Sequence, residues 1–222
     1  MKVYEYPIED YNFPRIVADY LKVDDLTRLE TDVSLETGAQ HSLYKNMEQA
    51  TLYKRLYEGL NGAVGQQFYQ TYERFIQQVV RAQFGEPIYY QKKPTHRILF
   101  LNNPGESRFH RDRDYGHSTA EINYLVPQTP AYDTNTFWLE SEEGKEDFKP
   151  VNMQVGEFVR FNGASLKHGA KVNTTRRSRV SFDFRVIPSS EAPASFTDTS
   201  AWKEEDKDNP LFKNAHNFVL CR

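Results

Sequence analysis

The most informative segment of the chain is RVSFDFRVIP, residues 179–188, in which polar and apolar residues alternate. Successive side chains of a β-strand point to opposite faces, so this segment predicts a strand with two unlike faces. One face carries a polar set, Arg179, Ser181, Asp183 and Arg185. The other face carries an apolar set, Val180, Phe182, Phe184 and Val186. Because unpaired charges are heavily penalised in a dry core, the polar face is expected to line a cavity that receives an anionic ligand.

The residues before this segment, from Pro87 onward, form short β-rich runs separated by turn residues. This texture is typical of an all-β sandwich or barrel. We expect strands at residues 97–101, 108–112, 120–126, 136–140, 157–161, 166–172 and 179–187.

The N-terminal part of the chain, up to about residue 90, is expected to be mainly helical. Asp24 or Asp25 can cap a short helix, and Ser42 can begin another that runs to residue 60. The clearest helix spans residues 65–84, where large apolar residues recur at helical spacing before a stop at Gly85. We interpret its aromatic stripe as core packing. Helices followed by strands predict an α+β fold with the helices packed on one sheet.

The length of 222 residues fits a single domain over residues 1–222. We expect a helical layer, a β core with the functional site and a loosely structured polar tail over residues 1–90, 91–188 and 189–222, respectively. Aromatic residues of the tail are expected to dock back, namely Trp202, Phe212 and Phe218.

The composition and charge exclude several classes of protein. Cys221 is the single cysteine, which excludes an intramolecular disulfide. The N-terminus lacks the apolar stretch of a signal peptide and no window approaches a membrane span, so a soluble, cytoplasmic protein is expected. The net charge of −3 argues against a nucleic-acid-binding protein, which usually carries a basic excess. We expect a monomer or homodimer whose partner is a small-molecule substrate.

Two separated segments carry candidate metal ligands. The run FHRDRDY, residues 109–115, places His110 and Asp112 on the same face of an expected strand. His168 follows after 55 intervening residues, in a second strand-like run. Two histidines and one carboxylate on one face of an octahedral Fe(II) leave three coordination positions open.

A candidate anion-binding pair follows the second histidine. Ten residues separate His168 from Arg179, which lies in the pattern Arg-x-Ser with Ser181. A guanidinium group can hold a ligand carboxylate through paired, charge-assisted hydrogen bonds, and the hydroxyl can add a third donor.

The order His110-x-Asp112, then His168, then Arg179-x-Ser181 resembles the signature of the Fe(II)/2-oxoglutarate oxygenases. More widely, residues 97–188 are similar to small hydroxylases of antibiotic pathways, of the streptomycin-biosynthesis StrG type. The resemblance implies a cupin-like jelly roll, the double-stranded β-helix. It also implies Fe(II) as cofactor and 2-oxoglutarate and O2 as co-substrates, with succinate and CO2 formed as a substrate C–H bond is hydroxylated.

The resemblance also implies a role for each matched residue. His110, Asp112 and His168 would bind the iron, and Arg179 with Ser181 would hold the distal carboxylate of 2-oxoglutarate. Asn123 would hydrogen-bond the co-substrate or the substrate, and an asparagine satisfied within the sheet is an equal alternative. The residues expected to reach the substrate are Arg185, Glu121, Asp183 and Tyr115, and for Arg185 and Asp183 an internal ion pair is the safer expectation. For Arg97 and Arg160 a structural or surface role is expected rather than binding.

Several functions stay open at this level. We expect a small polar substrate such as an amino acid, an aminocyclitol or a sugar derivative. The presence of Asp112 favours hydroxylation over halogenation, whereas desaturation, epoxidation and ring closure share the same chemistry. The alternatives are a non-catalytic jelly-roll or cupin-like binding protein, a cupin isomerase or zinc hydrolase, and an oxygenase acting on a protein or a nucleobase.

Overall fold

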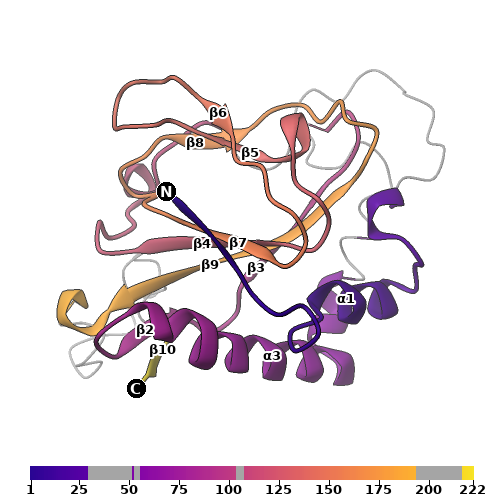
Figure 1. Ribbon diagram of the computed structural model, residues 1–222, viewed down its shortest axis with the longest axis horizontal. Coiled ribbons are helices and arrows are strands. Elements are labelled where there is room, and N and C mark those ends of the chain that lie inside the picture. The colour runs from indigo at the N-terminus through magenta and orange to yellow at the C-terminus, as the bar shows by residue number, and fades with distance from the viewer. Residues whose placement is uncertain (30–51, 53–55, 104–107, 194–216) are drawn as a thin grey trace, which may run out of the picture.

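The computed structural model of the chain describes residues 1–29, 52, 56–103, 108–193 and 217–222 (Figure 1). Its helices are α1 (Phe13–Leu21) and α3 (Ala63–Phe75), and α3 continues through the π-helical turn η2 (Ile76–Val80) and the 3-10 turn η3 (Arg81–Gln83). The strands are β1 (Lys2–Glu5), β2 (Ile88–Gln91), β3 (Thr95–Leu99), β4 (Ile122–Pro127), β5 (Phe137–Leu139), β6 (Lys149–Pro150), β7 (Glu157–Phe161), β8 (His168–Ala170), β9 (Arg179–Pro188) and β10 (Phe218–Cys221). The remaining 3-10 turns are η1 (Leu26–Arg28), η4 (Asp112–Tyr115), η5 (Asp133–Asn135) and η6 (Ser189–Glu191).

The strands form two antiparallel sheets. The main sheet has seven strands in the order β1-β7-β4-β9-β2-β10, and β3 also pairs with β9. The long strand β9 holds this sheet together, because it pairs with β4 along one edge and with β3 and then β2 along the other. The small sheet has three strands in the order β6-β5-β8. Figure 1 shows the small sheet on one side of the main sheet and the helices α1 and α3 on the other.

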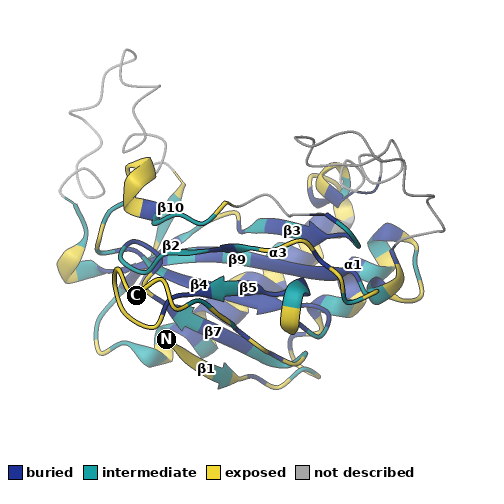
Figure 2. Cartoon of the chain, turned by 90° about the horizontal axis from the view of Figure 1, so that it is seen from above, coloured by how far each residue is buried: buried dark blue, intermediate teal, exposed yellow. Residues whose placement is uncertain are grey.

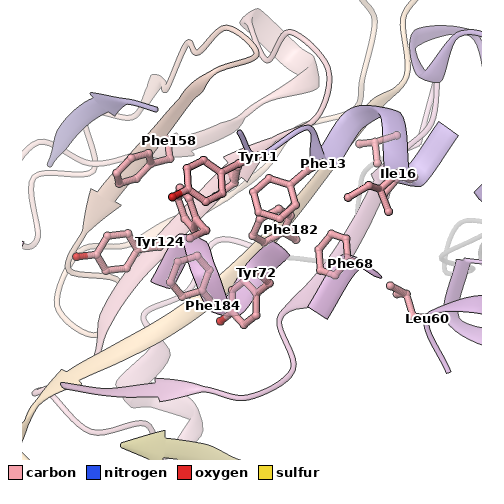
Figure 3. Close-up of a cluster of buried hydrophobic side chains, with 14 of the residues drawn as sticks. Tyr11, Phe13, Ile16, Leu60, Phe68, Tyr72, Tyr124, Phe158, Phe182 and Phe184 are labelled. Carbon is pink, nitrogen blue, oxygen red and sulfur yellow. The ribbon is translucent and has the colours of Figure 1, made fainter. Parts of the chain in front are cut away.

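Aromatic side chains fill the layer between the helices and the main sheet (Figure 3). The ring of Phe13 on α1 lies 4.9 Å from that of Phe182 on β9, and Tyr72 on α3 lies 5.3 Å from Phe184. All four side chains are almost fully buried. Burial of one such side chain stabilises the fold by roughly 1.5–3 kcal/mol, so this layer fixes how β9 sits in the molecule.

A second, smaller core lies on the opposite face of the main sheet, toward the small sheet. It contains Leu125 and Phe161 from the main sheet and Phe137 and Leu139 from the small sheet. The central strands are therefore buried on both faces, as the dark blue of β9 in Figure 2 shows. Among the described helices, none combines the length and apolar character that crossing a lipid bilayer requires.

The predicted α+β fold with helices on one sheet is confirmed. Strands were expected at the positions of β3, β4, β5, β7, β8 and β9, and the structure has them with ends shifted by a few residues. The expected long helix is also present, with its last turns in π and 3-10 geometry before Gly85. The jelly-roll description stays a prediction at this point.

The prediction of a strand at residues 108–112 was wrong. There, His110 makes a single bridge to His168, and Asp112 begins the turn η4. Two polar contacts favour the turn, because the backbone N–H of Asp112 donates to the carbonyl of Gly163 and that of Arg111 donates to the carboxylate of Asp114.

The expectations for the N-terminal part of the chain need two corrections. The N-terminal part is not only helical, since β1 and β2 both pair in the main sheet. The helix expected after Asp24 or Asp25 is only the turn η1, which the Asp25 carboxylate caps by accepting from Thr27 N–H. The helix expected from Ser42 falls mostly outside the described residues, although residues 56–60 are helical.

The C-terminal part of the chain is not only a loose tail. Its last residues form β10, in which Phe218 lies opposite Gln91 of β2. The docking expected of Phe218 is thus observed, and Trp202 and Phe212 lie outside the described residues. A four-residue strand has too little alternation to stand out from the sequence, and its pairing with β2 comes from the tertiary fold.

Candidate metal centre

His110, Asp112 and His168 converge between the two sheets. One ligand atom from each of these residues lies within 4.8 Å of the others. The backbone sets this arrangement, because His110 N–H donates to the carbonyl of His168 and His168 N–H donates to that of His110, both at 2.9 Å. The two imidazole rings therefore lie side by side, with centroids 4.6 Å apart. Asp112 joins them from the first residue of η4 and not from a shared strand.

The hydrogen bonds of the two histidines point one nitrogen of each ring toward the centre. Nδ1 of His110 lies 2.6 Å from the carbonyl of Arg108, and Nδ1 of His168 lies 3.0 Å from that of Leu166. A carbonyl only accepts, so in the neutral rings Nδ1 carries the proton and Nε2 carries the lone pair. The two Nε2 atoms lie 3.3 Å and 3.6 Å from Oδ1 of Asp112. This donor set fits a divalent transition-metal ion.

The electrostatics keep Asp112 ionised although it is only 2% exposed. Burial by itself raises the pKa of Asp112, but the hydrogen bond with His110 and the positive charge of Arg185 hold that pKa well below its usual range. When His110 is protonated, its Nε2–H can donate to the Asp112 carboxylate, and this hydrogen bond raises the pKa of His110. Burial lowers the pKa of His168, which favours its neutral, metal-binding form.

A pocket extends from these three residues along the polar face of β9. Arg179, Asp183 and Arg185 line it, as the alternation predicted, while the apolar face of β9 packs under the helices. Arg97, for which a structural or surface role was expected, lines the pocket too, and its Nε donates to the Asp183 carboxylate at 2.8 Å. The apolar walls come from both sheets and are Ile98, Leu99, Leu125, Phe137, Phe161 and Ala170.

The predicted pair Arg179 and Ser181 is present as a contact. Arg179 is 6% exposed, and its Nη1 donates to the Ser181 hydroxyl at 2.6 Å. Ser181 is fully buried behind the guanidinium group. Arg179 thus places a positive charge in the pocket, and its hydrogen bond to Ser181 fixes the orientation of the guanidinium group.

The other predicted site residues have different positions. Asn123 lines the pocket, and its Nδ2 donates to Oδ2 of Asp112 at 2.7 Å. Glu121 is not among the lining residues and lies behind Arg185, with the Nε of Arg185 3.3 Å from Glu121 Oε2. Tyr115 is 64% exposed and its ring stands edge-on to His110, with centroids 5.2 Å apart.

Sequence reasoning missed two glycines that shape this centre. The carbonyl of Gly163 accepts from Asp112 N–H, and its own N–H donates to Asn123 Oδ1 at 3.1 Å. Gly169 lies in β8, where an added Cβ would be 2.8 Å from the backbone of Phe109. A glycine at the end of a strand or inside one is a signal for a close backbone approach, and both glycines carried that signal.

Comparison with known proteins gives one clear relative. No family model matches the chain. Streptomycin biosynthesis protein StrG of Streptomyces griseus is 44% identical over 105 residues, which is 47% of this chain and 49% of that protein. The matched region therefore spans about half the length of this relative.

Two solved structures show a more distant likeness. The ThoJ–Ni complex, a non-heme monooxygenase, has a TM-score of 0.45 and 16% identity over 62% of this chain and 65% of that one. SnoN, a non-heme α-ketoglutarate-dependent epimerase from nogalamycin biosynthesis, has a TM-score of 0.42 and 16% identity over 56% of this chain and 58% of that one. These likenesses do not assign an activity to this chain.

Proposed function

We propose that this chain is an Fe(II)/2-oxoglutarate-dependent dioxygenase that hydroxylates a C–H bond of a small polar metabolite. The observation that supports this most strongly is the convergence of His110, Asp112 and His168 in a pocket that also holds the guanidinium group of Arg179. We also propose that the fold is a jelly roll, the double-stranded β-helix, because its two antiparallel sheets face each other.

The metal ligands would be Nε2 of His110, Nε2 of His168 and the Asp112 carboxylate. The carbonyls of Arg108 and Leu166 accept hydrogen bonds from Nδ1 of the two histidines, so the lone pair of each Nε2 faces the centre before any metal binds. Bound Fe(II) would supply activation of O2, with 2-oxoglutarate converted to succinate and CO2. Because Asp112 would take the coordination position that a halide ion would need, hydroxylation is favoured over halogenation.

Arg179 would hold the carboxylate of 2-oxoglutarate that does not reach the metal. A guanidinium group matches a carboxylate through two parallel hydrogen bonds, which are strengthened in a buried site. Ser181 would assist by accepting a hydrogen bond from Arg179, which holds the guanidinium group in its orientation. The apolar walls, including Phe137 and Phe161, would keep water away from the reacting C–H bond.

The substrate would be a small polar metabolite such as an amino acid, an aminocyclitol or a sugar derivative. The pocket offers it charged groups of both signs, because Arg97 and Asp183 are each partly exposed there, at 30% and 22% of their side chains. The relation to a protein of streptomycin biosynthesis over about half the chain supports a role in small-molecule biosynthesis.

An anaerobic titration with Fe(II) and 2-oxoglutarate tests the co-substrate assignment. We expect a weak visible charge-transfer band that needs both additions and is absent from the Asp112→Ala variant. A protein that stays colourless, with its metal bound or not, would contradict the assignment and favour a binding protein or another metal enzyme.

Succinate release from a metabolite panel tests the reaction itself. We expect release that depends on 2-oxoglutarate, on O2 and on one class of polar substrate. Succinate released only with a peptide or a nucleobase substrate would overturn the substrate class while keeping the oxygenase assignment.

A further inference from the structure

We propose that Asn123 and Arg185 are positioning residues that make Asp112 a ligand through one oxygen only. This inference rests on the proposed metal site. A carboxylate can bind a metal through one oxygen or through both, and the choice depends on what else holds it. In this protein the two oxygens have separate partners. Oδ1 lies toward Nε2 of both histidines, whereas Oδ2 lies toward Asn123 and Arg185.

Three donors converge on Oδ2 of Asp112. Nδ2 of Asn123 donates at 2.7 Å, and Nη2 and Nε of Arg185 donate at 3.1 Å and 3.2 Å. A carboxylate oxygen has about two lone-pair sites, so these donors occupy the acceptor capacity of Oδ2. A metal ion reaching Oδ2 would have to displace them. Oδ1 is therefore the oxygen left for the metal, and the carboxylate is held from turning into a chelating position.

The amide of Asn123 has its orientation fixed from the other side. Its Oδ1 accepts from Gly163 N–H at 3.1 Å, so its Nδ2 must face Asp112. The carbonyl of Gly163 also accepts from the backbone N–H of Asp112 at 2.9 Å. The backbone of Gly163 thus hydrogen-bonds to both Asp112 and Asn123 and fixes their relative positions. An added Cβ at Gly163 would lie 2.8 Å from the amide group of Asn123 and would push it away.

The guanidinium group of Arg185 is held between two buried carboxylates. Besides Asp112, its Nε lies 3.3 Å from Oε2 of Glu121, which is 2% exposed. Glu121 is fixed in turn, because its Oε1 accepts from Ser118 N–H at 3.2 Å and its Oε2 lies 2.9 Å from Nδ1 of His117. The positive charge of Arg185 therefore has a carboxylate partner on each side. It can orient Asp112 without leaving an unpaired charge beside the metal.

Co(II) titration of the metal-free protein without 2-oxoglutarate tests this inference. The readouts are the affinity for Co(II) and its visible absorption, which reports the ligands around the ion. The variants are Asn123→Leu, which removes the neutral donor at similar volume, and Arg185→Gln, which removes the charge and the paired contact. Arg113→Gln is the matched control. Arg113 directly follows Asp112, but its side chain pairs with the exposed Glu143 and not with the Asp112 carboxylate.

We expect Asn123→Leu to weaken Co(II) binding about 10-fold or more, the usual effect of losing a partner of a metal ligand. Arg185→Gln removes two of the three donors and should change the absorption spectrum as Oδ2 becomes available. Asn123→Leu should change the spectrum because Arg185 alone then orients the carboxylate, whereas Arg113→Gln should match the parent protein. Gly163→Ala should reproduce the effect of Asn123→Leu without removing any polar side chain, and it carries the test if Asn123→Leu does not fold.

Thermal unfolding of the metal-free variants distinguishes a loss of metal binding from a loss of folding. Folded variants with the affinity and spectrum of the parent protein would overturn the positioning role while leaving the metal site intact. A parent protein that binds no Co(II) would overturn the metal site itself and the positioning role with it.

Discussion

Gly169 lies where the backbones of the two histidine-bearing segments pack directly against each other in the candidate centre. An added Cβ would be 2.8 Å from both the backbone N and the Cα of Phe109. Phe109 directly precedes His110, whose backbone N–H and carbonyl both hydrogen-bond to the backbone of His168. A backbone atom cannot rotate away as the end of a long side chain can. The substitution Gly169→Ala must therefore move one histidine-bearing segment away from the other.

The size of this movement follows from the contact distance. Ordinary van der Waals contact of a Cβ begins at 3.4 Å, so the segments must separate by about 0.6 Å. Metal–ligand distances in a working site vary by only about 0.2 Å, so one ion would no longer fit both Nε2 atoms. We expect the affinity for Fe(II) to fall at least about 10-fold, or about 1.4 kcal/mol. Overpacking should also lower the free energy of unfolding by about 1–3 kcal/mol.

Anaerobic calorimetry with Fe(II) and thermal unfolding of the metal-free protein measure the two effects. Gly85→Ala is the matched control, because within the described part of the chain no atom beyond its sequence neighbours lies within 4 Å of the added Cβ. This control should bind Fe(II) like the parent protein and be equally stable or slightly more stable, since alanine restricts the unfolded chain. A folded Gly169→Ala variant with the Fe(II) affinity of the parent protein would refute the reasoning that this backbone contact sets the spacing of the histidines.

Three further predictions concern single side chains. Asp112→Ala should abolish metal binding and hydroxylation, and a metal content equal to that of the parent protein would contradict it. Arg179→Ala should mainly raise the 2-oxoglutarate requirement, and kinetics with normal turnover at low co-substrate would remove Arg179 from that role. Burial lowers the pKa of His96 from 6.5 to about 4, so its contribution to stability is complete above pH 6.5 and falls by up to about 3 kcal/mol as the pH drops to about 4. His96→Phe keeps a ring against Phe68 and should flatten this part of the profile in urea unfolding, and an unchanged pH dependence would show that His96 is not responsible.

Local patterns predicted the elements whose two faces meet different surroundings. The alternation in residues 179–188 predicted β9, because one face of this strand packs under aromatic side chains and the other lines the pocket. The helical spacing of Phe68, Tyr72 and Phe75 predicted α3 for the same reason. Such patterns depend on residues a few positions apart, so the sequence alone displays them.

The edge strands and the metal-ligand segment did not follow from local patterns. β1 and β10 have four residues each and pair with strands far away in the chain. Around Asp112 the local alternation predicted a strand, but hydrogen bonds to Gly163 and within the turn η4 decided the backbone there. Tertiary contacts overrode the local preference at this point.

The sequence by itself determined which residues were candidates for the centre, namely His110, Asp112, His168 and Arg179, because residue type and spacing carry that information. Only the tertiary structure decided that Asn123 and Arg185 hold the Asp112 carboxylate. Those contacts join residues 11 and 73 positions apart, and they exist only because β4 and β9 pair in one register, with Asn123 opposite Arg185. A shift of that register by one residue would turn both side chains to the other face of the sheet, and the order of residues along the chain does not display the register.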